Sequence, residues 1–404
     1  MSAPSSPASE RLAGSVSPKV VLAAILLGRL AVNMQYRVIY PYLPAISRGL
    51  GVTLATASLL ITARSLAGLT SPWYGRLSDR YGRKSLMIVG LLAVVAGTGL
   101  MAITPSFGWA VLAFVILGFA RASYDPAAQA HISDLVPYDR RGRALGLVEL
   151  PWSAAWLIGV PIAGLLIARA GWQSPFAWLA VFGAICLVFV GWTRFPAAPK
   201  GRGFAGGSVT MGPVAFQLTR PMVAAFGVSA LLGLANVSFF IISGAWLESQ
   251  FGLAVGALGL VFGITGFAEL AAELLSAGVL DRIGKVRALF AGLMLNALAY
   301  ILLPRLSLSL FLALVGLSFV ILTAEFSIVS VLSPLSELAP EMRGTVLALN
   351  SALMAGGTLV ASLVAPRLWE AGGLSAVSTF SAAAICAALL LLWLVRWNAK
   401  PDGL

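Results

Sequence analysis

Charged residues, cysteine and histidine are all scarce in this chain of 404 residues. Only 10% of the residues are charged whereas 59% are hydrophobic, a balance that excludes a soluble globular protein and indicates a polytopic membrane protein. The two cysteines, Cys186 and Cys386, lie in apolar stretches, which favours packing over a disulfide framework or a metal site. The single histidine, His131, is a poor basis for a metal centre or for catalysis.

Motifs for nucleotide-driven or enzymatic chemistry are missing as well. The phosphate-binding pattern G-x-x-x-x-G-K-[ST] does not occur in the sequence, and neither a catalytic triad nor a metal-ligand cluster is evident. The net charge of +12 does not indicate nucleic-acid binding, because the basic residues are spread over short segments between apolar runs. We therefore expect no enzyme activity, no cofactor, no nucleic-acid partner and no use of ATP.

Apolar runs long enough to cross a bilayer fill most of the chain. A helix needs about 20 apolar residues to span the hydrocarbon core, and lipid cannot satisfy the backbone groups that other structures leave open. We predict helical spans near 18–42, 54–77, 84–104, 108–133, 143–168, 174–195, 218–247, 255–279, 284–305, 307–335, 343–368 and 373–396.

Lysine and arginine are distributed unevenly between the two sides of these spans. Of the 27 such residues, nineteen fall on the side shared by both termini and four lie inside spans. The opposite side carries the remaining four, which are Arg48, Arg169, Arg305 and Arg367. Because short cytoplasmic loops are enriched in basic residues, we expect cytoplasmic termini, an even number of twelve spans, and a multi-pass protein of the plasma (inner) membrane.

Residues 75–84, with the sequence Gly-Arg-Leu-Ser-Asp-Arg-Tyr-Gly-Arg-Lys, connect the second and third predicted spans. Glycine permits tight backbone approach, and the acid Asp79 suggests a specific partner such as a helix N-terminus or an arginine. The segment closely resembles the G-x-L-x-D-R-x-G-R-K loop of the major facilitator superfamily. The resemblance implies a latch on the cytoplasmic side. The matching residues are Gly75, Leu77, Asp79, Arg80, Gly82, Arg83 and Lys84.

A worn copy of this loop occurs later in the chain. Asp281, followed by Arg282, lies 202 residues after Asp79, and Asn236 lies 203 residues after Asn33. The superfamily is built from two six-helix halves in parallel relation, with the substrate site between them near the midplane. The resemblance therefore implies an all-α transmembrane, twelve-helix major facilitator fold with two six-helix bundles in pseudo-twofold relation.

This repeat also predicts how the chain is divided. The expected parts are a disordered cytoplasmic tail at 1–17, a six-helix bundle at 18–195, a cytoplasmic linker at 196–217, a second bundle at 218–396 and a cytoplasmic tail at 397–404.

Four arginines, Arg29, Arg37, Arg64 and Arg121, lie inside predicted spans of the first half. A charge at membrane depth costs at least about 2.5–3.5 kcal/mol, so each should face a wet cavity or a partner. Snorkelling to an interface is the alternative. Arg64 lies roughly 22 Å from Asp79 at 1.5 Å per helical residue, past the bilayer centre, whereas Arg37 is close enough to the outer end of its helix to snorkel.

The first predicted helix carries a polar and aromatic stripe. Arg29, Asn33, Tyr36, Arg37 and Tyr40 recur at spacings of three, four and seven, which places them on one face. A seam between helices joined by polar groups is an alternative, but we favour a cavity wall, one that suits a molecule with an anionic or zwitterionic end. The residues we assign to the substrate cavity are Arg29, Asn33, Tyr36, Arg37, Arg64, Asn236, Phe239 and Phe240.

In the fourth helix, Arg121 and Asp125 are four residues apart and could neutralise each other along the helix. The segment Leu117–Arg121 resembles the l-x-x-x-R motif of proton-coupled drug antiporters, which implies a role for Arg121 in proton coupling. The sequence departs from that motif at Tyr124 and Asp125, where the family has Gln-Gly, so Asp125 is a candidate proton site of its own.

The fifth helix contains Gly159, Pro161 and Gly164, a loose form of the antiporter motif G-P-x-x-G in which Val160 stands where the family has glycine. These residues bend a span and allow close packing, and a plain packing kink explains them equally well. Glu149, near the start of this helix, is expected close to the cytoplasmic gate.

The second half carries acids where the first carries arginines. Glu269 and Glu273 share one face of the eighth helix, and Glu325 lies mid-span in the tenth. A carboxyl group in a low-dielectric setting can exchange protons near neutral pH, so these three are candidate proton carriers. The alternative is a set of ion pairs with first-half arginines, and a pair that forms in one state and breaks in another is itself a gate.

We therefore predict a secondary transporter that works by alternating access. The resemblance to drug antiporters favours proton-coupled efflux of small amphipathic or lipophilic compounds, with the proton gradient as energy source. The expected partners are a small-molecule substrate and the lipid bilayer, and the protein is expected to be a monomer. Lipid or glycolipid flipping, proton-coupled uptake of organic anions, and a non-transporting sensor or assembly factor remain alternatives.

Overall fold

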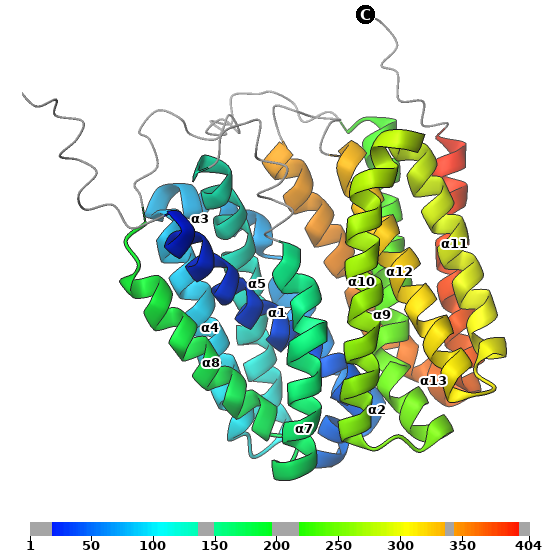
Figure 1. Ribbon diagram of the computed structural model, residues 1–404, viewed down its shortest axis with the longest axis horizontal. Helices are drawn as coiled ribbons and strands as arrows, with labels where there is room; N and C mark the ends of the chain where they lie inside the picture. The colour runs from blue at the N-terminus through cyan, green and yellow to red at the C-terminus, as the bar shows by residue number, and fades with distance from the viewer. Residues whose placement is uncertain (1–17, 136–148, 196–217, 336–342, 396–404) are drawn as a thin grey trace, which may run out of the picture.

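The computed structural model describes residues 18–135, 149–195, 218–335 and 343–395. The long elements within these ranges are all helices (Figure 1). Ten of the described helices are long and apolar enough to cross a membrane, which makes this an integral, multi-pass membrane protein. The predicted tails at 1–17 and 397–404 and the linker at 196–217 lie outside the described residues.

Helices before the linker form what we call the first half, and helices after it form the second half. The first half contains α1 (Pro18–Gly49), α2 (Leu54–Gly68), α3 (Ser71–Tyr81), α4 (Arg83–Ala102), α5 (Phe107–Leu135), a span from Glu149 through the π-helix η3 (Ala155–Gly159) and α7 (Val160–Ala170), and α8 (Ser174–Trp192). The second half contains α9 (Arg220–Phe251), α10 (Val255–Ile283), α11 (Lys285–Leu306), α12 (Leu310–Leu335) and α13 (Arg343–Leu394).

The described part of the structure has ten candidate membrane spans, whereas the sequence predicts twelve. Two differences in how the helices are divided account for this. The second predicted span is divided into α2 and α3, because Pro72 in the first turn of α3 cannot continue the hydrogen bonding of a preceding helix. The last two predicted spans are joined in α13, which is kinked at Gly372 and Gly373, where Gly373 has a φ of 58°. With α2 and α3 counted once and α13 counted twice, the described chain crosses twelve times, and the predicted all-α fold is confirmed.

The first helix is longer than the sequence predicts. The predicted end near 42 is too early, since α1 continues through Pro41 and Pro44 to Gly49. Proline removes a backbone donor, but in a membrane span neighbouring groups can satisfy the freed carbonyls.

The same turn occurs in both halves at the predicted repeat distance. Gly82 joins α3 to α4 with φ 89° and ψ 145°, and Gly284 joins α10 to α11 with φ 87° and ψ 141°. This backbone conformation is essentially restricted to glycine. The two positions are 202 residues apart, the same spacing as Asp79 and Asp281, so the repeat seen in the sequence is a repeat of backbone geometry.

The halves are sealed against each other at the face where α1 ends, which we call the far face; the face where α1 begins is the near face. Two helix crossings leave little space for a side chain in place of glycine. A Cβ atom on Gly244 of α9 would lie 2.1 Å from the carbonyl oxygen of Pro41, and one on Gly164 of α7 would lie 3.1 Å from that of Val255. Arg48 and Glu248 form an ion pair at 2.9 Å across the same face.

Candidate functional site

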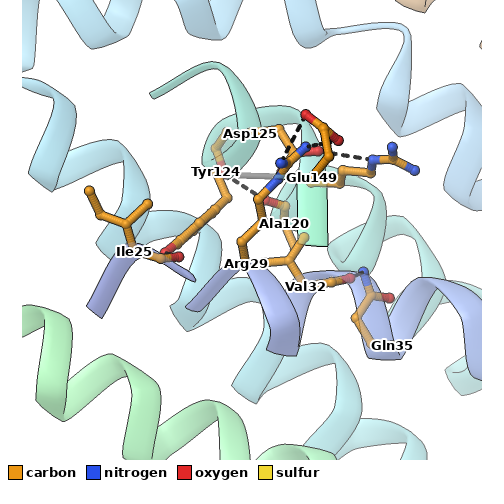
Figure 2. Close-up of polar contacts among 10 residues, drawn as sticks. Ile25, Arg29, Val32, Gln35, Ala120, Tyr124, Asp125 and Glu149 are labelled. Carbon is orange, nitrogen blue, oxygen red and sulfur yellow. Dashed lines mark hydrogen bonds and ion pairs between the residues drawn. The ribbon is translucent and has the colours of Figure 1, made fainter. Parts of the chain in front are cut away.

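Four charged side chains of the first half form one cluster, which we call the Arg29 cluster and which consists of Arg29, Arg121, Asp125 and Glu149. The guanidinium of Arg29 donates to both carboxylate oxygens of Glu149 at 3.1 Å and to Asp125 at 3.2 Å (Figure 2). Arg121 donates to the other oxygen of Asp125 at 3.1 Å. Two cations and two carboxylates therefore balance one another within the first half, as the spacing of Arg121 and Asp125 predicts.

One buried ion pair connects the halves. Arg37 of α1 donates to Glu269 of α10, and the two side chains are only 5% and 2% exposed. The Arg37 guanidinium also lies 3.6 Å from the ring centre of Trp152 and 4.8 Å from that of Trp156. This burial shows that Arg37 does not snorkel to an interface. It sits instead at the boundary between the halves, in contact with Glu269, which the sequence analysis names as a candidate proton carrier.

The other two candidate proton carriers lie at the same boundary. The Ser153 hydroxyl donates to Glu273 at 2.7 Å, and Trp152 hydrogen-bonds to Glu325. Glu273 and Glu325 are near enough to Glu149 and to each other to interact electrostatically. Carboxylates of the second half therefore face the start of the fifth span of the first half.

Arg64 has a different environment from the other three interior arginines. Its guanidinium donates to the backbone carbonyl of Tyr36 at 3.0 Å and to the hydroxyl of Tyr40 at 2.9 Å. It also lies 3.8 Å from the ring centre of Tyr36 and 5.9 Å from that of Phe114. The residue is 3% exposed, so Arg64 does not reach an interface either. No carboxylate of the described residues lies within ion-pair distance of it.

Guanidinium groups and aromatic rings alternate across this region. The ring of Tyr36 has Arg64 at 3.8 Å and Arg121 at 4.5 Å from its centre. The ring of Trp152 has Arg121 at 4.4 Å and Arg37 at 3.6 Å. Rings attract cations through their electron-rich faces, so Tyr36 and Trp152 hold three like charges close together.

Some of the remaining residues assigned to the substrate cavity lie inside one half of the molecule, and others lie at the boundary between the two halves. Asn33 is fully buried in α1. Asn236 accepts a hydrogen bond from the Tyr300 hydroxyl at 2.6 Å, and the buried Phe239 packs on the same Tyr300 within the second half. Phe240 instead contacts Tyr40 and Trp156 of the first half at 5.9 and 5.7 Å between ring centres. Of the predicted second-half cavity residues, Phe240 therefore faces the boundary.

The predicted cytoplasmic gate motif is only partly described. Gly82 adopts the conformation that requires glycine, Arg80 is exposed beside Tyr81, and the Lys84 amine donates to the backbone carbonyl of Gly191 at 2.7 Å. The side chains of Asp79 and Asp281 lie outside the described part, as does the environment of Gly75. Residues Arg83 and Arg282 lie on the same side of the molecule, at the start of α4 and the end of α10.

The glycines and proline of the fifth span affect both the geometry of their own helix and its packing against α10. The helix winds as a π-helix over Ala155–Gly159, which ends two residues before Pro161, whose missing N–H leaves the usual i to i−4 bond unmade. Gly164 and Gly259 then bring α7 and α10 into backbone contact, with the Cβ position of Gly259 3.2 Å from the Cα of Pro161.

Sequence reasoning missed most of the fifth span's contribution. The carboxylate of Glu149, which we expect close to the cytoplasmic gate, also holds Arg29. Trp152, Ser153 and Trp156 were not singled out, although each contacts a charged group at the boundary or the cluster. The signal was present, because Glu149, Trp152, Ser153 and Trp156 recur at spacings of three, four and seven, as the stripe in the first helix does.

Comparison with known proteins shows which protein family the chain belongs to. The profile of the family described as Major Facilitator Superfamily matches residues 25–241, more than half of the chain. The chain belongs to the major facilitator superfamily. Its relatives are transporters rather than enzymes, as the missing catalytic motifs indicate.

Named relatives of this major facilitator protein include drug-resistance proteins. It is 26% identical over 332 residues to the MFS-type transporter YceJ of Bacillus subtilis, covering 82% of this chain and 84% of that one. It is 27% identical over 296 residues to the class C tetracycline resistance protein of Escherichia coli, covering 70% and 72%. The human organic anion transporter MFSD10 superposes with a TM-score of 0.67 at 18% identity, covering 94% and 100%, which shows a shared fold.

Proposed function

We propose that this protein exports small amphipathic or lipophilic compounds in exchange for protons by alternating access. The observation that carries the proposal is the buried Arg37–Glu269 ion pair across the boundary between the halves. Relatives named for tetracycline resistance and multidrug resistance support an efflux direction. The protein is a transporter by its family; its coupling ion and substrate class belong to the proposal.

The ion pair can couple protons to movement because each of its charges is expensive to bury alone. Removing one partner of a buried pair typically costs about 3–5 kcal/mol. A proton that neutralises Glu269 therefore leaves Arg37 in need of another partner. Glu325 and Glu273 lie near enough to interact electrostatically with Arg37. Exchange of Arg37 between carboxylates is thus a step that protonation can drive.

The described state is closed at the far face and accessible from the near face. Glu149 and Arg121, toward the near face of their helices, have side chains 46% and 34% exposed, whereas Arg37 and Glu269 beyond them are buried. We place both termini in the cytoplasm and the protein in the inner membrane, so this state is open to the cytoplasm. Asp79, Arg80, Gly82, Arg83 and Lys84 with Asp281 and Arg282 then form the gate that closes when the far face opens.

Transport in reconstituted vesicles tests this proposal. With an imposed pH gradient, the protein should drive dyes, drugs or labelled lipids against their concentration gradient, and the nature of the moved compound separates drug efflux from lipid flipping. Glu269→Gln should abolish proton-driven movement, because glutamine cannot exchange a proton. Glu248→Gln is the matched control, since Glu248 pairs with Arg48 at the exposed far face, and should retain activity. Intact movement in Glu269→Gln, Glu273→Gln and Glu325→Gln alike would refute proton coupling through these residues.

A further inference from the structure

We propose that the transported compounds include aromatic organic anions, and that Arg64 binds their carboxylate or sulfonate group. The site consists of Arg64 and Arg121 with the rings of Tyr36, Tyr40 and Phe114, and we call it the Arg64 site. The proposal rests on the transport function proposed above and names one substrate class for it. Three observations support it, concerning charge balance, hydrogen bonding and access.

Charge balance singles out Arg64 among the four interior arginines. Arg29 and Arg121 are balanced by Asp125 and Glu149, and Arg37 is balanced by Glu269. Arg64 is as deeply buried as Arg29 and Arg37, at 3% exposure, yet the described residues give it no carboxylate. A buried charge without a counter-charge is costly, and arginine does not lose its proton at any ordinary pH. An anion bound from solution would remove this cost.

Hydrogen bonding within the described residues leaves one donor of Arg64 unused. The two bonds that hold Arg64 go to neutral oxygens, the Tyr36 carbonyl and the Tyr40 hydroxyl. They orient the guanidinium without cancelling its charge. The buried Nε atom has no hydrogen-bond partner among the described residues. An arginine with an unpartnered Nε and a fixed orientation suits a carboxylate or sulfonate, because these groups accept two parallel N–H bonds.

Access and shape favour an anion that carries a ring. Tyr36 is half-buried and lies between Arg64 and Arg121, whose centres are 3.8 and 4.5 Å from its ring. The Arg121 side chain is 34% exposed and bonds to Asp125 through Nε. An anion arriving from the near face therefore meets Arg121 first and Arg64 behind it. A flat ring on the ligand can pack against Tyr36 and Trp152, which already contact each other at 5.9 Å.

The location of the site links cargo to the boundary between the halves. Tyr40, which holds Arg64, also packs on Phe240 of the second half at 5.9 Å between ring centres. Tyr36 and the Arg37 of the cross-boundary ion pair are consecutive residues of α1. A ligand that draws the Arg64 guanidinium away from Tyr40 thus acts on a contact between the halves.

Matched pairs of anionic and neutral probes test the Arg64 site. The probes are 2-naphthoate, indole-3-acetate and naphthalene-2-sulfonate, each compared with its uncharged amide, and binding to the purified full chain is measured by titration calorimetry. At least one anion should bind more tightly than its amide, and Arg64→Gln should weaken it roughly tenfold or more, the size of a lost charge-assisted hydrogen bond. Arg64→Lys should weaken it less, because lysine keeps the charge but not the paired donors.

The control is Arg305→Gln, an exposed arginine at the far end of α11 that should leave binding unchanged. Amides that bind as tightly as the anions, anion binding that survives Arg64→Gln, or no binding of any probe would each overturn the Arg64 site. If proton-driven movement of other compounds persisted under those results, the transport proposal would stand. Arg64-dependent anion binding without any proton-driven movement would leave the Arg64 site standing and would contradict the transport proposal.

Discussion

Each interior arginine is stabilised in a different way, although all four lie in apolar helices of one half. Arg29 donates hydrogen bonds to both carboxylate oxygens of Glu149 and one to Asp125. Arg64 instead donates to two neutral oxygens and lies against aromatic rings. The partner that comes with each charge decides its role. Arg29 and Arg121 are balanced by carboxylates of the first half and so stabilise that half. Arg37 is balanced by a carboxylate of the second half, so its ion pair forms only when the two halves are in contact there. Arg64 has no such carboxylate among the described residues and can bind an anionic ligand.

The Arg29 cluster should therefore contribute to stability more than a surface ion pair does. Glu149→Ala removes two charge-assisted hydrogen bonds to the buried Arg29 and should lower the free energy of unfolding by about 1.5–3 kcal/mol. Glu248→Ala breaks the pair with Arg48, whose side chain is 57% exposed, and should lower it by only about 0–1 kcal/mol. Unfolding measured for both variants in lipid bicelles checks this. Equal losses in the two variants would contradict a structural role for the cluster.

At the scale of elements, glycines determine how closely helices from opposite halves approach. A Cβ atom at Gly244 would lie 2.1 Å from the Pro41 carbonyl oxygen, a distance that real contacts do not reach, so α9 and α1 meet there only because the residue is glycine. At Gly356 in α13, a Cβ atom would meet nothing within 4 Å. The crossing of α1 and α9, rather than the exposed Arg48–Glu248 pair, is what allows the far face to close.

Gly244→Ala should for this reason hold the far face open. Spin labels on Ser106→Cys and Leu308→Cys, exposed positions in far-face turns of the two halves, report the separation of the halves by pulsed electron resonance. The exposed Cys386 is replaced by serine in this background. Gly244→Ala should lengthen the distance and lower turnover, while Gly356→Ala should change neither. Identical distance distributions for the two variants would mean that the crossing does not control closure.

Elements were more predictable from the sequence than contacts were. Apolar runs and the repeat of the Gly82 turn at Gly284 gave the helices and their order, because both depend on local residues. The break between α2 and α3 and the extension of α1 past Pro41 were missed, since proline can end, bend or continue a membrane helix depending on its neighbours. The acid that pairs with Arg37 lies 232 residues away, and only the placement of the two halves reveals it.

At the scale of the whole molecule, two halves meet along a boundary that contains the Arg37–Glu269 pair together with Glu273 and Glu325. Helices α1, α2 and α7 of the first half contact α9, α13 and α10 of the second, and Figure 1 shows the two sets of helices side by side. The far face closes by backbone contact, which does not depend on pH, whereas the proposed coupling makes the Arg37–Glu269 pair of the interior depend on pH. A proton on Glu269 removes one of two buried opposite charges, so acidification should weaken the closed far face.

The most direct test of this account is the distance between the Ser106 and Leu308 labels as a function of pH, measured in wild-type and Glu269→Gln backgrounds. In the wild-type background, acidification should shift the population from the short to the long distance. Glu269→Gln, which is neutral at every pH, should show the long distance even at alkaline pH. The claim that the Arg37–Glu269 ion pair holds the two halves together would be contradicted by a distance distribution that did not change with pH in the wild-type background. A distribution that stayed short in Glu269→Gln would contradict it as well.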